Sequence, residues 1–150
     1  MANYPLDDEQ AASLKLFVIL SKAYKTLMDH AVKDIRQYGV SSSEFAILEV
    51  LYTKGRIPLQ QIGEKVLITS GSITYNIDKL EKKGLMKRVP CPEDRRVTYA
   101  EVSETGKLWF DEIFPGHAQA IHERMQGLTS EEKAVAAELL KKLGKAAGKG

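Results

Sequence analysis

The residues best able to do chemistry lie between positions 69 and 96. Hydroxyl and amide side chains are concentrated in 69–76, lysines follow at 79 and 82, and a later turn carries Asp94, Arg95 and Arg96. Hydroxyl and amide groups hydrogen-bond to base edges and phosphates, and basic side chains pair with phosphates. This order of residue types predicts a surface that binds double-stranded DNA.

We expect residues 69–83 to form a helix with two different faces. Ile73, Ile77 and Leu80 recur at helical spacing and form its apolar stripe. In a recognition helix, the first turns read base edges in the major groove and the end passes the phosphates. A solvated amphipathic helix is the alternative. The predicted DNA contacts on this helix are Thr69, Ser70, Gly71, Ser72, Thr74, Tyr75, Asn76, Lys79 and Lys82.

The segment that follows predicts a β-hairpin with a charged tip. Residues 85–89 and 97–102 each alternate as a strand does, and a turn-rich stretch joins them. An arginine at such a tip fits the narrow, negative minor groove, and Asp94 can orient the guanidinium of Arg96. We therefore add Asp94, Arg95 and Arg96 to the predicted DNA contacts. A charged tip alone is usually just solvated, but a basic helix followed closely by an Arg-tipped hairpin is more specific.

These residues need elements that position them. Apolar periodicity predicts helices over 8–38 and from about 42 to 53, a short helix with Pro58 in its first turn, the 69–83 helix, and two helices after residue 103. Ser41 to Glu44 form a predicted capping box, and Thr129 is a predicted cap. We expect Pro115 to kink or interrupt the fifth helix, and residues 144–150 to fray.

The predicted fold is mainly α with a small β-hairpin wing: a winged helix-turn-helix with long N- and C-terminal dimerisation helices. One domain spans 1–150, with a reading head at about 41–102 and dimerisation helices at about 8–38 and 103–147. The terminal helices are more apolar than a reading head of this size needs. A second copy would bury that excess, so we expect a homodimer.

Charge and composition narrow the class of protein. The 150 residues carry a net charge of +2, but residues 54–96 hold ten bases against five acids. A basic centre between acidic ends indicates that one part meets an anion. No apolar run approaches the roughly 20 residues that cross a bilayer. A single cysteine, Cys91, excludes an intrachain disulfide and suits a reducing, cytoplasmic location.

The stretch from about Val40 to Gly106 resembles the MarR family of transcriptional regulators. The wing signature Asp-x-Arg is met by Asp94 and Arg96, and the Leu-Glu-x-x-Gly-Leu corner is met from Leu80 to Leu85. Two positions depart from the pattern. Cys91 stands where the family usually has Asp before the wing proline, and Tyr75 stands where Arg is frequent. The other matching segments are residues 61–66, 69–74 and 102–106.

The resemblance implies an obligate homodimer, built by the terminal helices, that binds pseudo-palindromic promoter DNA. It implies repression that is relieved by a small, often phenolic or aromatic, effector or by cysteine oxidation. The effector pocket would lie between the dimerisation helices and the reading head. Its candidate residues, each of which could also be plain core, are Tyr24, His30, Phe45 and Trp109.

Two other classes of function are compatible with parts of the sequence. Arg88, Arg95 and Arg96 would favour a Cys91 thiolate, which allows a thiol- or electrophile-sensing regulator switched through Cys91. A winged-helix module that binds proteins instead of DNA is the second rival, and the basic segment 54–96 argues against it. The sequence predicts no metal site, no cofactor and no enzymatic activity, because it holds no clustered metal-binding side chains, nucleophile motif or phosphate loop.

Overall fold

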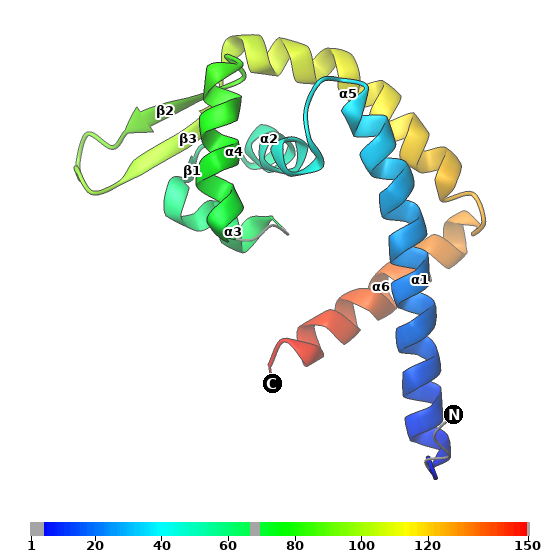
Figure 1. Cartoon of the computed structure of the whole chain (residues 1–150). Coiled ribbons are helices and arrows are strands. Elements are labelled where there is room, and N and C mark those ends of the chain that lie inside the picture. Colours follow the sequence, from blue (N-terminus) through cyan, green and yellow to red (C-terminus); the bar gives the residue numbers. More distant parts are fainter. Residues whose placement is uncertain (1–4, 67–69, 150) are drawn as a thin grey trace.

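The computed structural model describes residues 5–66 and 70–149, and the side chains of residues 70–72 lie outside the description. The described chain is mainly helical, with one small antiparallel sheet next to α2, α3 and α4 (Figure 1). Together with the hairpin that follows α4, this is the predicted winged helix-turn-helix. The helices are α1 (Asp8–Arg36), α2 (Ser42–Lys54), α3 (Ile62–Lys65), α4 (Ser70–Lys82), α5 (Glu104–Arg124) and α6 (Ser130–Ala147).

Side-chain caps define where several of these helices begin. Ser41 Oγ accepts the Glu44 amide of α2, and Glu44 accepts the Ser41 amide in return, as predicted. The same reciprocal pair forms between Thr129 and Glu132 at α6. Such boxes satisfy amides that have no partner inside the helix, which is why short polar motifs located these starts from sequence.

The sheet has the strand order β1-β3-β2 and is antiparallel throughout. The hairpin strands β2 (Met86–Pro90) and β3 (Thr98–Val102) agree with the prediction. The placement of Pro58 in a helix was wrong, because Ile57–Pro58 forms strand β1 and pairs with Ala100 and Tyr99 of β3. A 3-10 turn, η1 (Leu59–Gln61), then leads into α3.

The two C-terminal helices are more continuous than expected. Helix α5 is not interrupted at Pro115, although its ribbon bends along its length (Figure 1). Phe114 and His117, on either side of the proline, have ring centroids 6.2 Å apart, and the His117 ring lies 4.5 Å from Phe45. These ring contacts flank the position at which proline removes a backbone hydrogen bond. The expected fraying from Gly144 was also wrong, because α6 continues to Ala147.

The hydrophobic core lies between α2, α4, α5 and the sheet. Ile47, Leu48, Leu80, Ala100 and Phe110 are completely or almost completely buried there. Helix α1 has two buried residues, Ala31 and Ile35, of which Ile35 belongs to this core, and α6 has no buried residue among those described. The apolar side chains of the terminal helices therefore remain largely exposed in a single copy. In the described part of the chain, no helix combines the length and hydropathy needed to cross a membrane.

Candidate nucleic-acid interface

The outer face of α4 gathers several predicted DNA contacts. Tyr75 is 62% exposed, and Lys79 Nζ lies 5.2 Å from the centroid of its ring. Thr74 and Lys82 are exposed on the same helix. A phenol ring and ammonium groups thus face solvent together. Thr69 lies outside the described residues, and so do the side chains of Ser70, Gly71 and Ser72, so their contacts stay predictions.

Asn76 does not belong to this face. It is only 6% exposed, so its inclusion among base-reading residues was wrong for the chain as folded. Asn76 comes three residues after Ile73 and four before Leu80, which places it on the inner side of the helix. Its residue type suggested a base contact, but its spacing from the apolar stripe indicated burial.

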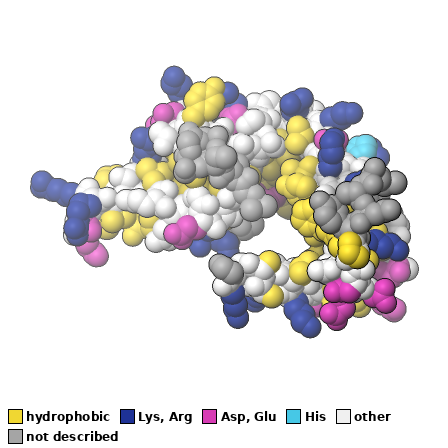
Figure 2. Space-filling model, turned by 60° about the horizontal axis from the view of Figure 1, so that its bottom comes forward, with side chains coloured by type: hydrophobic (Ala, Val, Ile, Leu, Met, Phe, Trp, Pro, Cys, Tyr) yellow, Lys and Arg dark blue, Asp and Glu magenta, His cyan; other side chains and the backbone are white. Residues whose placement is uncertain are grey.

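The wing tip presents an arginine held by a carboxylate, as the sequence predicted. Asp94 Oδ1 accepts the Arg96 amide at 3.0 Å and the Arg96 Nε at 3.1 Å, while Asp94 Oδ2 accepts Nη2 at 3.3 Å. The Arg96 side chain is nevertheless 90% exposed. Its guanidinium and amide hold the pKa of Asp94 below the ordinary value, so this carboxylate stays charged at neutral pH. Figure 2 shows basic side chains projecting from the wing with acidic ones beside them.

Sequence reasoning missed the residues that hold the wing in place. Gln60 Nε2, from η1, donates to the Arg96 carbonyl at 3.3 Å. Arg88 of β2 pairs with Asp78 of α4, and its Nε lies 3.7 Å from Glu81. Helix α4 and the wing are thus joined by ion pairs. Complementary charges ten residues apart gave only a weak hint of this contact.

A part-buried ion pair links the C-terminal end of α4 to α2. Lys83 Nζ lies 2.8 Å from Glu44 Oε2, and the Glu44 side chain is only 2% exposed. Burial alone would raise the Glu44 pKa, but hydrogen bonds from Lys83 and the Ser41 amide lower it overall. Glu44 is therefore a charged group inside the fold, and Lys83 is its counterion.

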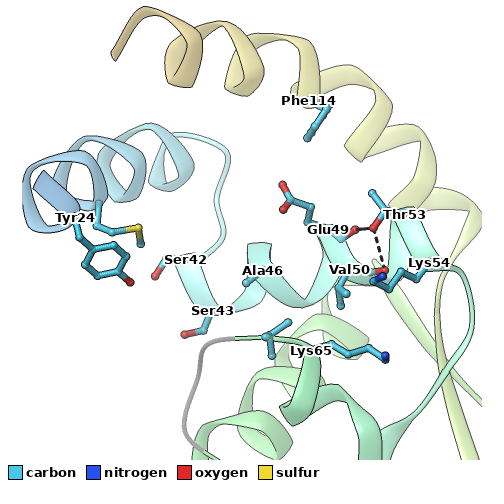
Figure 3. Close-up of a pocket in the computed structure, with 12 residues that line it drawn as sticks. Tyr24, Ser42, Ser43, Ala46, Glu49, Val50, Thr53, Lys54, Lys65 and Phe114 are labelled. Carbon is cyan, nitrogen blue, oxygen red and sulfur yellow. Dashed lines mark hydrogen bonds between the residues drawn. The ribbon is translucent and has the colours of Figure 1, made fainter. Parts of the chain in front are cut away.

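A cavity of about 720 Å³ lies between α1, α2 and α5. Figure 3 shows Tyr24 and Phe114 on opposite sides of it and the Glu49 carboxylate between them. The lining mixes apolar groups with hydroxyl and charged groups, which suits an aromatic molecule with a polar substituent. Its lining residues are Tyr24, Met28, Ser42, Ser43, Ala46, Glu49, Val50, Thr53, Lys54, Lys65, Val66 and Phe114.

Only Tyr24 of the four predicted pocket residues lines this cavity. Phe45 is buried in the core, and Trp109 packs near Phe110 with ring centroids 6.4 Å apart. His30 lines a separate, smaller cavity of about 260 Å³ between α1 and α5. The idea that the four share one site was wrong. Aromatic side chains were chosen by type, and packing between distant helices decided which of them face open space.

The comparisons with known proteins agree with this geometry. Residues 40–98 match the family model of the MarR family. The HTH-type transcriptional regulator MhqR of Bacillus subtilis (strain 168) is 51% identical over 132 residues, which is 88% of this chain and 91% of that protein. The chain belongs to the MarR family of transcriptional regulators.

Two solved structures share the fold of this MarR-family chain. Sco3205 of Streptomyces coelicolor, a MarR-family regulator solved in complex with DNA, has a TM-score of 0.79 at 22% identity, and the match covers 95% of this chain and 93% of that one. BpsR of Bordetella bronchiseptica, whose DNA binding is regulated by 6-hydroxynicotinic acid, has a TM-score of 0.76 at 22% identity, with coverages of 94% and 98%. At these identities the likeness establishes the fold alone.

Two further polar groups of this MarR-family chain lie away from the α4 face. Cys91 is a half-buried free thiol in the wing, and Arg88, one of the arginines expected to favour its thiolate, is paired with carboxylates of α4. A sensing role for Cys91 stays a prediction.

His117 Nδ1 lies 2.8 Å from Asp34 Oδ2, which joins α5 to α1. Within the described ranges, no three potential metal ligands cluster.

Proposed function

We propose that the chain is a homodimeric repressor that binds pseudo-palindromic promoter DNA. The observation that carries this proposal is the pairing of two exposed features: the Tyr75 and Lys79 face of α4, and the Asp94-oriented Arg96 at the wing tip. In this arrangement α4 enters a major groove and Arg96 enters the flanking minor groove. Arg95 and Lys82 supply charge for the phosphates that border these grooves.

We assign DNA reading and dimerisation to different parts of the chain. Within a single domain of 150 residues, the reading head comprises residues 41–102, and residues 8–38 and 103–147 form the dimer. Apolar side chains left exposed on the terminal helices support this assignment, because a second copy would remove them from water. The Phe17 side chain, for example, is 68% exposed. The exposed apolar residues of α1 and α6 include Leu14, Phe17, Val18, Val135, Leu139, Leu140 and Leu143.

We infer that a small aromatic or phenolic effector relieves repression. The cavity in Figure 3 lies where α1 and α5 meet α2, between the proposed dimerisation helices and the reading head. An occupant would touch elements of both parts and could favour one arrangement of them. Regulation of BpsR by 6-hydroxynicotinic acid, an aromatic acid, supports this class of ligand. The effector hypothesis fails if phenolic compounds change neither the melting temperature nor the affinity for DNA.

Selection of bound fragments from genomic DNA of the source tests the function. The purified protein is mixed with the fragments at low and at physiological salt. We expect a few palindrome-bearing promoters to survive the higher salt, with half-sites about one helical turn apart. Only salt-sensitive, sequence-blind binding would indicate a general DNA-coating role instead. No binding from a reduced, ligand-free preparation would favour the protein-interaction module.

A further inference from the structure

Lys83 follows the basic C-terminal end of α4, but its ammonium is bound by groups of the protein itself. Lys83 Nζ donates to Glu44 Oε2 at 2.8 Å and to the Gly39 carbonyl at 3.1 Å. Its side chain is 35% exposed. The adjacent Lys82 is exposed as well, so Lys83 is distinguished by the carboxylate and the carbonyl that accept from its ammonium.

Three parts of the fold meet at this ammonium. Gly39 closes the turn between α1 and α2, with a positive φ of 85° that favours glycine. Glu44 belongs to the first turn of α2, where its second oxygen, Oε1, accepts the Ser41 amide at 3.1 Å. Both carboxylate oxygens are therefore engaged, one by the α2 cap and one by Lys83. The end of the recognition helix is thereby tied to the corner where α1 joins α2.

A phosphate contact by Lys83 would disrupt this arrangement. Turning the ammonium toward DNA would leave the buried Glu44 carboxylate without its counterion, which is strongly unfavourable. Arg88 already joins α4 to β2 from the other side. Lys83 adds the link toward α1, the helix that leads into the proposed dimer.

We propose that Lys83 is a positioning residue for DNA reading: through Glu44 and Gly39 it fixes α4 relative to the α1–α2 corner, and so sets the separation of the two recognition helices in the dimer. This inference rests on the proposed function. If the distance between the two α4 helices is fixed, the dimer fits half-sites at one spacing only. If that distance varies, the dimer also binds operators whose half-sites are incorrectly spaced. Lys83 therefore contributes to specificity, and Lys82 contributes charge.

The test compares Lys83→Met with its matched neighbour Lys82→Met. Affinity is measured across a salt series for an operator duplex from the genomic selection and for a duplex with one base pair inserted between its half-sites. Lys82→Met should weaken binding to both duplexes and flatten the salt dependence, by a slope of about 0.9 for each phosphate that the variant no longer neutralises. Lys83→Met should keep the parent's salt slope and lower the ratio of the two affinities about tenfold. Lys83→Arg, which keeps a charge for Glu44, should restore most of that ratio.

A second readout follows the separation itself. A spin label at Thr74→Cys in a Cys91→Ser background reports the distance between the two α4 helices of a dimer. Its distribution should broaden in Lys83→Met and stay narrow in Lys82→Met. If Lys83→Met unfolds, the double variant Glu44→Gln/Lys83→Met, which leaves no buried charge unpaired, takes its place with the same expectation.

Each outcome decides the proposal. A flattened salt slope in the Lys83 variant would make Lys83 a phosphate contact, and an unchanged affinity ratio with an unchanged distance distribution would overturn the positioning role. If the parent binds neither duplex, the proposed function fails by itself and the spin-label distance decides the role of Lys83. A parent that is monomeric overturns both proposals, since it has no helix separation to set.

Discussion

Replacing Arg96 by alanine should weaken operator binding and leave the fold intact. The side chain is 90% exposed, so its removal deletes no core packing. Each subunit loses one guanidinium that is already oriented for the minor groove. Removal of one specific arginine contact costs about 1–3 kcal/mol, or roughly 5- to 150-fold in affinity.

Asp94→Ala provides the intermediate case. It keeps the guanidinium but removes both carboxylate oxygens that accept from Arg96, at 3.1 and 3.3 Å. Arg96 must then be ordered on binding, so the loss should be smaller than that for Arg96→Ala but measurable. Arg95→Ala is the matched control, because this exposed neighbouring arginine should contribute mainly charge.

Fluorescence anisotropy on two duplexes measures these effects. One carries the selected operator, and the other has A·T pairs replaced by G·C where the wing lands, which widens the minor groove. The parent should prefer the first duplex, Arg96→Ala should lose the preference, and Arg95→Ala should keep it at lower affinity. An Arg96→Ala protein that binds both duplexes like the parent would refute the wing assignment.

Four more substitutions at single positions have expected outcomes. The fold lowers the pKa of Glu44 from its ordinary value of 4.5. The charged Glu44 carboxylate therefore stabilises the protein above pH 4.5, and this stabilisation is lost as the pH falls through the lowered pKa. Melting curves of Glu44→Gln and the parent should therefore differ at neutral pH and converge in acid. Gly106→Ala should lower the free energy of unfolding by about 1–3 kcal/mol in denaturant titrations, because the added Cβ would overlap the Leu85 carbonyl oxygen. Gly144→Ala, in the same assay, should raise the free energy of unfolding by up to about 1 kcal/mol, because open space surrounds this helical glycine. Tyr75→Ala should change which operators are selected more than it changes the salt slope, because the exposed ring carries no charge, and an unchanged selection would remove Tyr75 from the base-reading set.

Local sequence signals located most of the fold. The caps at Ser41 and Thr129 and the change from helical to alternating periodicity near residue 85 correspond to helix starts and strands in the structure. Strand β1 escaped detection because two residues, Ile57 and Pro58, are too few to show an alternation. Its pairing with β3 depends on a contact made more than 40 residues later in the chain.

The functional surface was less predictable because residue type and residue position can disagree. Tyr75 and Asn76 are adjacent polar residues of one helix, yet one is mainly exposed and the other is buried. The cavity was harder still, since its walls come from helices that meet only in the folded chain. Lys83 and Glu44 are 39 residues apart, and no local pattern announced their ion pair.

The ion pairs also change the interpretation of the basic segment 54–96, whose charge suggested binding to an anion. Five of its ten bases lie within 4 Å of a carboxylate: Arg56, Lys83, Lys87, Arg88 and Arg96. Among these, only Arg96 belongs to the proposed DNA surface, and its carboxylate partner orients it there. Half of the bases in this segment thus maintain the geometry of helix and wing, and the other half remain to contact phosphates. A protein that coats DNA without regard to sequence would need more unpaired cations and less fixed geometry.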